Sequence, residues 1–202
     1  MNNPFKLVWL KCIIVLLLIA GISGGLLAIL NDVFYVSPEE RTHRAIQKIY
    51  GEKKEYSVII DVDGTDEDKK QPVIYEDMGR IDKIYYVDKT DDADKNFDML
   101  FKTTGYFGYK NGTITLWVKV VCSENEQPTI DKIILESFDK QTLMSKLGNS
   151  FYEGFYDVTD NYYQAKDKKD EEKTYNPVSG ATYSATAACN AVNCVIKFVK
   201  GE

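Results

Sequence analysis

The chain has little of the chemistry that holds metal ions. Its 202 residues include a single histidine, His43, and four cysteines, none of them in a C-x-x-C pair. Zinc and iron–sulfur sites need several such ligands at close spacing, so the sequence predicts no metal site. Cys189 and Cys194 lie five residues apart on an expected helix, about 140° around its axis, which disfavours a disulfide between them. Both are expected to be small buried apolar residues.

The motifs of several enzyme classes are also missing. There is no Walker or Rossmann glycine pattern and no Ser/His/Asp set, so no catalytic residue is predicted. Nor is there a basic face, because the residues after position 30 include 31 acidic and 23 basic side chains, a net charge of −8. Nucleic-acid binding depends on clustered positive charge, so that class of partner is excluded. The same negative charge argues against close adhesion of the domain to anionic lipid.

The first thirty residues contain no acidic side chain and one long apolar run. Cys12 to Leu30 is uncharged over 19 residues, which is long enough to cross a bilayer as a helix. We therefore expect residues 1–11 to be cytoplasmic and residues 12–30 to form a single transmembrane helix in the cell membrane. Lys6 and Lys11 precede the run, and this favours an extracytoplasmic C-terminal domain.

A cleaved signal peptide is the alternative for this segment. Small residues at positions 21 and 23–25 could host a cleavage site. The apolar run continues through residues 26–30, beyond the usual length of a signal core, so a retained anchor is favoured. Basic residues at positions 41, 44 and 48 also follow the span, so the charge asymmetry across it is incomplete.

Downstream patterns predict an α+β fold. Ser37, Pro38 and Glu40 form a capping box at the start of a helix that Gly51 ends, giving a stalk helix within residues 31–51. The extracytoplasmic domain then covers residues 52–202, with a mostly antiparallel sheet packed against helices. Strands are expected at residues 56–61, 81–87, 113–121 and 130–136. Helices are expected at residues 141–155, with an interruption near Gly148-Asn149, and at residues 183–199.

Two stretches of the domain carry more specific expectations. Lys110-Asn111-Gly112 predicts an Asn-Gly hairpin turn of type I′. In the strand after it, Ile114, Leu116, Val118 and Val120 point to one face and Trp117 to the other. The charged run of residues 166–173 is expected to be a solvated loop.

The most informative short motif precedes the last helix. It consists of Ser179-Gly180-Ala181-Thr182, followed by Tyr183 and Ser184. A helix start supplies unpaired N–H groups and a positive dipole end, which favour a bound phosphate, and Gly180 and Ala181 leave room for a phosphate to approach the backbone. The alternative is structural: Ser179 or Thr182 only caps the helix.

Together with the N-terminal anchor and the aromatic turn at Gly105 to Tyr109, this motif resembles the covalent FMN-binding domain of the RnfG/NqrC family, whose RnfG members belong to Rnf complexes. In that family the threonine of S-G-A-T carries FMN through a phosphoester bond, and Thr182 is its match. The resemblance implies an electron-transfer subunit of an ion-translocating ferredoxin:NAD⁺ oxidoreductase. It also implies the other Rnf subunits as partners and an FAD-dependent FMN transferase for maturation.

The resemblance further implies which side chains surround the flavin. The expected cofactor-binding residues are Thr182, Ser179, Gly180, Ala181, Tyr183, Ser184, Gln141, Thr142 and Tyr106. Phe107 and Trp117 are further candidates to cover the ring, although Trp117 is equally well explained as packed under a helix. Gln141 and Thr142 stand where the family has the Glu and Thr of an E-T-P-G-L-G loop, whose Pro-Gly is missing here. Asn176 replaces an acidic residue that the transferase recognises.

Two other functions stay open at the level of sequence. One is a free-standing, membrane-anchored FMN redox protein outside an Rnf complex. The other is an extracytoplasmic interaction domain in which S-G-A-T is only a helix cap. That last alternative predicts no flavin, and it predicts a loss of about 1 kcal/mol on replacing Thr182 with alanine.

Overall fold

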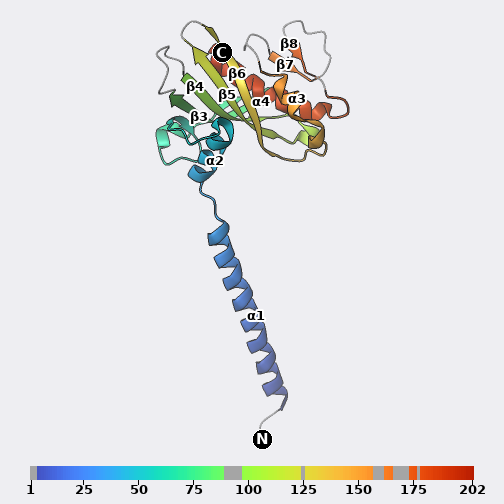
Figure 1. Cartoon of the computed structure of the whole chain (residues 1–202). Helices are drawn as coiled ribbons and strands as arrows, with labels where there is room; N and C mark the ends of the chain where they lie inside the picture. Colours follow the sequence, from blue (N-terminus) through green and yellow to red (C-terminus); the bar gives the residue numbers. More distant parts are fainter. Residues whose placement is uncertain (1–3, 89–96, 124–125, 157–161, 166–172, 177) are drawn as a thin grey trace. The chain divides into compact units, whose positions relative to one another are not determined.

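A computed structural model describes residues 4–88, 97–123, 126–156, 162–165, 173–176 and 178–202. The chain divides into two compact units, Met1–Arg41 and Thr42–Glu202 (Figure 1). The first unit contains a long apolar helix, and the second contains an open antiparallel sheet with helices packed on it. The predicted α+β class is therefore confirmed.

The sheet is antiparallel and has the order β1-β3-β4-β5-β6, with β2 paired to β3. Its strands are β1 (Ser57–Asp61), β2 (Val73–Tyr75), β3 (Gly79–Asp88), β4 (Phe97–Gly105), β5 (Ile114–Ser123) and β6 (Glu126–Phe138). The sequence does not predict β2 or β4. In β4, the buried polar residues Asp98, Thr103 and Thr104 interrupt the alternation by which a half-buried strand is recognised.

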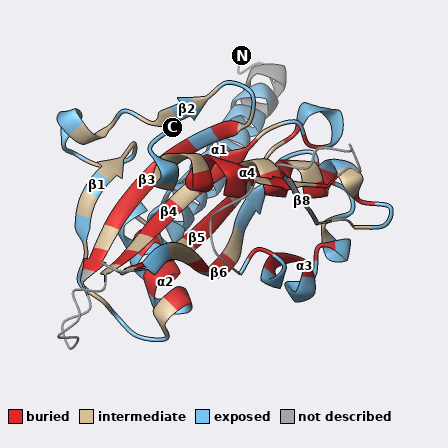
Figure 2. Cartoon of the chain, turned by 90° about the horizontal axis from the view of Figure 1, so that it is seen from above, coloured by how far each residue is buried: buried red, intermediate tan, exposed pale blue. Residues whose placement is uncertain are grey.

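Two helices cover the two faces of the sheet. α4 (Thr182–Lys200) packs on the face that carries Ile114, Leu116, Val118 and Val120. Trp117 points to the opposite face, where α2 (Pro38–Tyr50) covers it. The predicted alternation along β5 is thus confirmed. In Figure 2, the buried positions gather in α4 and in the strands that it crosses.

α2 begins and ends where the sequence predicts. The Ser37 hydroxyl accepts a hydrogen bond of 3.1 Å from the Glu40 N–H, and Gly51 ends the helix with a φ of 78°. Its buried residues Ala45, Ile46 and Ile49 pack against the sheet. Residues 42–50, which the sequence assigns to a stalk, are therefore part of the domain's packing.

The connection between β4 and β5 corrects the predicted turn. The two consecutive left-handed residues are Lys110 and Asn111, with φ values of 51° and 56°, in the short 3₁₀ helix η2 (Tyr109–Asn111). Gly112 follows with a φ of −78°, so the type I′ conformation lies one residue earlier than predicted. Gly112 is needed for a different reason: a Cβ there would lie 2.1 Å from the Asp139 carbonyl oxygen.

The remaining elements are short. They are η1 (Glu67–Lys69), η3 (Met144–Lys146), α3 (Asn149–Glu153), β7 (Tyr162–Gln164) and β8 (Lys173–Tyr175). Over residues 141–155, where a helix interrupted near Gly148-Asn149 is predicted, the helical segments are the short η3 and α3, and extended backbone at Gly148 separates them at the predicted interruption. β7 and β8 pair in parallel within a region expected to be a loop. The charged residues 166–172 lie outside the described residues.

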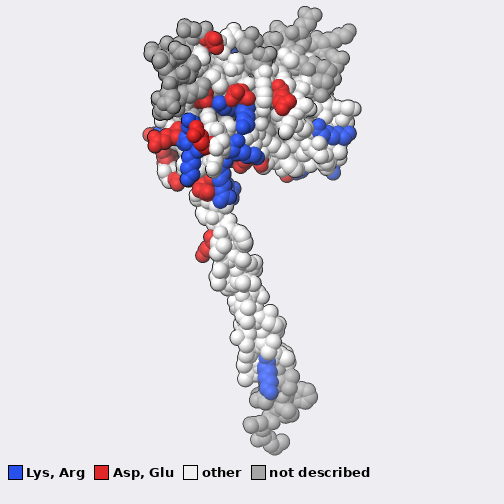
Figure 3. Space-filling view, viewed as in Figure 1, with Lys and Arg blue, Asp and Glu red and all other residues white. Residues whose placement is uncertain are grey.

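α1 (Pro4–Phe34) is one continuous helix. From Trp9 onward its large apolar side chains are exposed on every side, and Figure 3 shows almost no charge along it. Such a surface suits an apolar solvent rather than water. The part from Trp9 to Phe34 is long and apolar enough to cross a membrane, and it contains the predicted span of residues 12–30. Residues 35–37 then connect α1 to α2.

Candidate functional site

A tight turn leads into α4 and contains the S-G-A-T motif. Gly180 has a φ of 76°, and the Ala181 N–H donates to the Val178 carbonyl at 3.3 Å. Ala181 occupies the N-cap position of α4, and no side chain caps the helix there. Neither Ser179 nor Thr182 is therefore the cap, and the capping explanation of the motif is wrong. Glycine is suited to this turn because its left-handed φ disfavours other residues.

A cation lies against this turn. The Lys146 ammonium, carried by η3, is 3.4 Å from the Ser179 carbonyl oxygen. A Cβ at Gly180 would lie 2.6 Å from the same nitrogen. Ser179 and Gly180 are exposed, and Thr182 is half-buried. Because the first turn of a helix leaves backbone N–H groups unpaired, this end of α4 combines N–H donors with a positive charge.

Gln141 joins three segments around the motif. Its Oε1 accepts hydrogen bonds from the Ser184 hydroxyl at 2.8 Å and from the Tyr109 N–H at 3.1 Å, while its Nε2 donates to the Asp139 carbonyl at 2.9 Å. The side chain is buried. Gln141 and Ser184 therefore tie the loop of residues 106–112 to the start of α4. Their predicted contacts with a cofactor stay predictions.

The other expected site residues are distributed unevenly. Tyr106 is half-buried, and its backbone makes two hydrogen bonds. Its N–H donates to the Met78 carbonyl at 2.8 Å, and its carbonyl accepts from Asn190 Nδ2 at 3.0 Å. Thr142 is exposed. Trp117 packs under α2, on the sheet face opposite α4, so the explanation that places it beneath a helix is confirmed and it does not approach Thr182.

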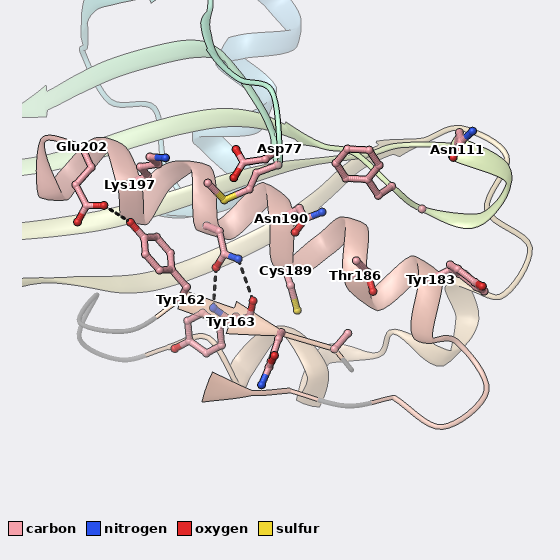
Figure 4. Close-up of a pocket in the computed structure, with 16 residues that line it drawn as sticks. Asp77, Asn111, Tyr162, Tyr163, Tyr183, Thr186, Cys189, Asn190, Lys197 and Glu202 are labelled. Atoms are coloured by element: carbon pink, nitrogen blue, oxygen red, sulfur yellow. Dashed lines mark hydrogen bonds between the residues drawn. The ribbon is translucent and has the colours of Figure 1, made fainter. Parts of the chain in front are cut away.

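A cavity of about 660 Å³ runs along α4 from Tyr183, the residue after Thr182, as far as Glu202 (Figure 4). One stripe of the helix lines it: Tyr183, Thr186, Asn190, Asn193 and Lys197. Phe107, Gly108 and Asn111 of the 106–112 loop and residues 162–165 around β7 line it as well. This volume is typical of small-molecule and cofactor sites.

Sequence reasoning missed the polar stripe of α4. Thr186, Asn190 and Asn193 stand four, eight and eleven residues after Thr182, and such spacings place side chains on the same helix face. The signal was present as polar positions repeating along an otherwise alanine-rich helix. It could not be interpreted without the sheet, which buries the rest of α4.

Cysteine chemistry is not prominent in the cavity. Cys189 contributes to its lining, but the side chain is almost fully buried, and burial raises the pKa of its thiol to about 12. A neutral, buried thiol is a poor nucleophile. Cys122, Cys189 and Cys194 are free and buried, as predicted for the last two. No cluster of three or more metal-binding side chains occurs among the residues that the structure describes.

The far end of the cavity is charged. The Tyr162 hydroxyl donates to a Glu202 carboxylate oxygen at 2.7 Å (Figure 4). Burial, followed by that bond, raises the pKa of Tyr162 to about 12. Asp77 and Lys197 also line this end. A ligand anchored near Thr182 would therefore meet aromatic side chains first and charged side chains last.

The residues present fit a tethered flavin phosphate. A phosphodiester at Thr182 would find the N–H groups of α4 and the Lys146 ammonium. A flat ring needs apolar walls with a few polar groups, and the cavity offers Phe107, Tyr183 and the Asn190 amide. In comparison with known proteins, no family model matches the chain, and no curated protein matches it.

Proposed function

We propose that this chain is a membrane-anchored electron carrier in which FMN is esterified to Thr182 and its ring lies in the cavity along α4. The observation that carries the proposal is an S-G-A-T turn without a side-chain cap, in which Thr182 directly precedes Tyr183, a residue that lines that cavity. FMN supplies one- and two-electron transfer when it is bound. The protein's part is to hold the phosphate, orient the ring and limit its contact with water.

The residues around the S-G-A-T turn would each have a separate role in holding the phosphate of FMN. The Thr182 hydroxyl accepts the covalent bond, and the structure gives it no hydrogen-bond partner among the described residues. Lys146 and the α4 N–H groups would neutralise the phosphodiester charge. Ser179 lies on the exposed side of the turn, where it would contact the phosphate without being the attachment point.

The cellular setting follows from the resemblance and from α1. A single pass through the cell membrane, with lysines on its N-terminal side, would place the domain on the extracytoplasmic side. A covalent bond suits that location, because free FMN would be lost there by diffusion. The proposed role is that of the RnfG component of an Rnf-type ferredoxin:NAD⁺ oxidoreductase, with the other Rnf subunits as electron partners and an FAD-dependent FMN transferase for maturation.

Intact mass tests the attachment. The full chain would be purified in detergent after co-expression with an FMN transferase that is active on a known substrate. We expect a gain equal to FMN less one water in the wild type and in Ser179→Ala, and no gain in Thr182→Ala. Thr182→Ser retains a hydroxyl and would report how strictly the transferase requires threonine. An unmodified wild-type chain under these conditions would contradict the proposal.

The assembly needs a separate test. Membranes of the native host would be solubilised mildly, and the protein would be followed by its in-gel flavin fluorescence. Co-migration with several other integral membrane proteins that carry flavin or iron–sulfur groups is expected for an Rnf component. Migration as a single flavin-labelled chain would instead indicate a free-standing redox protein.

A further inference from the structure

The polar stripe of α4 divides into residues that are bonded within the protein and one that is available to a ligand. The Thr186 hydroxyl donates to the Thr182 carbonyl at 2.8 Å. Asn193 accepts from the Tyr163 N–H at 2.7 Å and donates to the Tyr163 carbonyl at 2.9 Å (Figure 4, dashed lines). These side chains hold the first turn of α4 and β7 in place.

Asn190 differs from both. Its Nδ2 donates to the Tyr106 carbonyl at 3.0 Å, and its Oδ1 accepts no hydrogen bond among the described residues. The side chain is half-buried and faces the cavity (Figure 4). It stands eight residues beyond Thr182, about 12 Å along the helix axis. An amide oxygen is thus offered to a ligand that reaches inward from the S-G-A-T turn.

Phe107, the residue after Tyr106, is held in an unusual conformation. Its φ is 65°, in the left-handed region where bulky side chains are genuine outliers. The ring is half-exposed and lines the cavity. The neighbouring backbone is fixed on both sides, by Asn190 at the Tyr106 carbonyl and by a 2.9 Å bond from the Gly108 N–H to the Gly112 carbonyl.

Left-handed residues gather in this part of the molecule. Every non-glycine residue with positive φ among the described residues belongs to one of two loops: Phe107, Lys110, Asn111 and Lys140. The buried Gln141 side chain links those loops by its bonds to Tyr109 and Asp139. Strained backbone persists where the surrounding structure over-determines it, and it clusters at ligand sites. The strained backbone therefore indicates that these two loops already have their ligand-binding conformation before any ligand binds.

We propose that Phe107 and Asn190 together form the subsite for the flavin ring, an inference that rests on the proposed FMN attachment at Thr182. Phe107 is its apolar wall, and the Asn190 amide is its polar contact. The hydrogen bond from Asn190 to the Tyr106 carbonyl makes the two side chains one unit, because it fixes the loop that presents Phe107. Tyr183 lines the entrance beside the attachment point and is more than half exposed, so it is a cover for the ring rather than its binding wall.

Flavin fluorescence tests the apolar wall. Each variant would first be shown by intact mass to carry FMN. An indole in contact with an excited flavin quenches it by electron transfer, so Phe107→Trp is expected to shorten the fluorescence lifetime severalfold. Tyr109→Trp is the matched control, because Tyr109 belongs to the same loop, is also exposed and does not line the cavity. Equal lifetimes in the two variants would overturn the assignment of Phe107.

The reduction potential tests the polar contact. Asn190→Asp places a negative charge beside the ring and is expected to lower the potential of the bound flavin, because added electrons are repelled at short range. Asn149→Asp adds the same charge at an exposed position at the start of α3 and is expected to leave the potential unchanged. Equal shifts, or none, would overturn the role of Asn190. A wild-type chain that carries no FMN would instead contradict the proposed function itself.

Discussion

The two helices that cover the sheet are built on different principles. α2 has a serine N-cap, a glycine C-cap and a narrow stripe of apolar residues that packs on Tyr85, Leu100 and Trp117. α4 has no side-chain cap, is buried over most of its circumference and carries small residues such as Ala187 and Ala191 toward the sheet. α2 follows the rules that stabilise a helix, whereas α4 departs from them at the end where the S-G-A-T turn lies.

The difference between α2 and α4 distinguishes a helix that mainly stabilises the fold from one whose start carries the proposed site. A missing cap leaves N–H donors without partners, which is a disadvantage in a helix whose only task is packing. In α4 the Lys146 ammonium lies against the turn that precedes these donors, at the Ser179 carbonyl, and Tyr183 of the first helical turn lines the cavity. Both faces of the sheet carry large buried side chains, but only the face under α4 has the close approach of Gly105 to the α4 backbone at Ala187 and Ala191. Substitutions on the two faces should therefore have different consequences.

The largest expected effect is on the α2 face. Trp117→Ala should lower the free energy of unfolding by about 4 kcal/mol, because it removes a buried indole and leaves a cavity. The proposed FMN attachment at Thr182 should persist in the fraction that remains folded. Thermal unfolding of the full chain in detergent, with intact mass, measures both. Phe107→Ala, at a half-exposed position, is the control and should unfold nearly as the wild type; an equal loss in the two variants would contradict the comparison.

A second test disrupts the packing of α4 on the sheet. A Cβ at Gly105 would lie 1.9 Å from the Ala187 carbonyl oxygen and 2.5 Å from the Ala191 nitrogen. Gly105→Ala must therefore push α4 off β4, at a cost of about 3 kcal/mol for overpacking. It should also reduce FMN loading, because α4 lines the cavity. Gly148→Ala, where a Cβ meets nothing within 4 Å, should change neither quantity; a stable, fully loaded Gly105→Ala chain would refute the close approach.

A third test concerns the charges under α2. Burial alone would raise the pKa of Asp61, but hydrogen bonds from Lys83 and Tyr85 outweigh it and hold that pKa below its usual 3.8. A depressed carboxylate pKa stabilises the fold above the unfolded pKa, and the contribution is lost as the pH falls through the lower folded value. Asp61→Asn should cost about 2 kcal/mol at neutral pH and flatten the loss of stability below about pH 4.

The matched control for this test is Asp63→Asn. Asp63 also contacts the Lys83 ammonium, at 3.1 Å, but it is half-exposed, so its removal should cost less. Unfolding followed at several pH values between about 2 and 7 covers the carboxylate range. An acid profile of Asp61→Asn that superimposes on the wild type would show that Asp61 is not the group responsible.

The smallest effect compares the two helix starts. Ser37→Ala should cost about 1 kcal/mol, because it removes the hydrogen bond to the Glu40 N–H. Thr182→Ala, in protein made without the transferase, should cost no more than a few tenths of a kcal/mol, about the effect of a surface substitution, since Thr182 caps nothing. Thermal unfolding of the two variants, side by side, distinguishes them; a loss at Thr182 as large as that at Ser37 would restore the capping explanation.

Local signals in the sequence predict the elements that obey local rules. The capping box of α2, the alternation of β5 and the last helix of the chain all lie where expected. β4 does not obey such a rule, because its polar residues find partners in space: the Thr103 hydroxyl donates to the Ala191 carbonyl, 88 residues away. The turn between β4 and β5 shifts by one residue because Gly112 is held against Asp139.

The residues of the candidate site also fall into those that the local sequence reveals and those that only the fold brings together. S-G-A-T and the adjacent tyrosine are consecutive in the sequence and could be found there. Lys146, Asn190 and Phe107 come together only through the fold, and no spacing in the sequence relates them. The conformation of Phe107 could not be foreseen either, because a left-handed φ at a phenylalanine contradicts local preference.

β7 is joined to the domain in an uncommon way. The Asn193 side chain offers Tyr163 one carbonyl oxygen and one N–H, the same pair that a neighbouring strand would offer through its backbone. A single amide on a helix thus acts as the strand partner of a three-residue segment. Of the natural side chains, only asparagine and glutamine carry both groups, and glutamine is longer by one methylene. The position of β7, which forms one wall of the cavity, therefore depends on the two hydrogen bonds that the Asn193 side chain makes with the Tyr163 backbone.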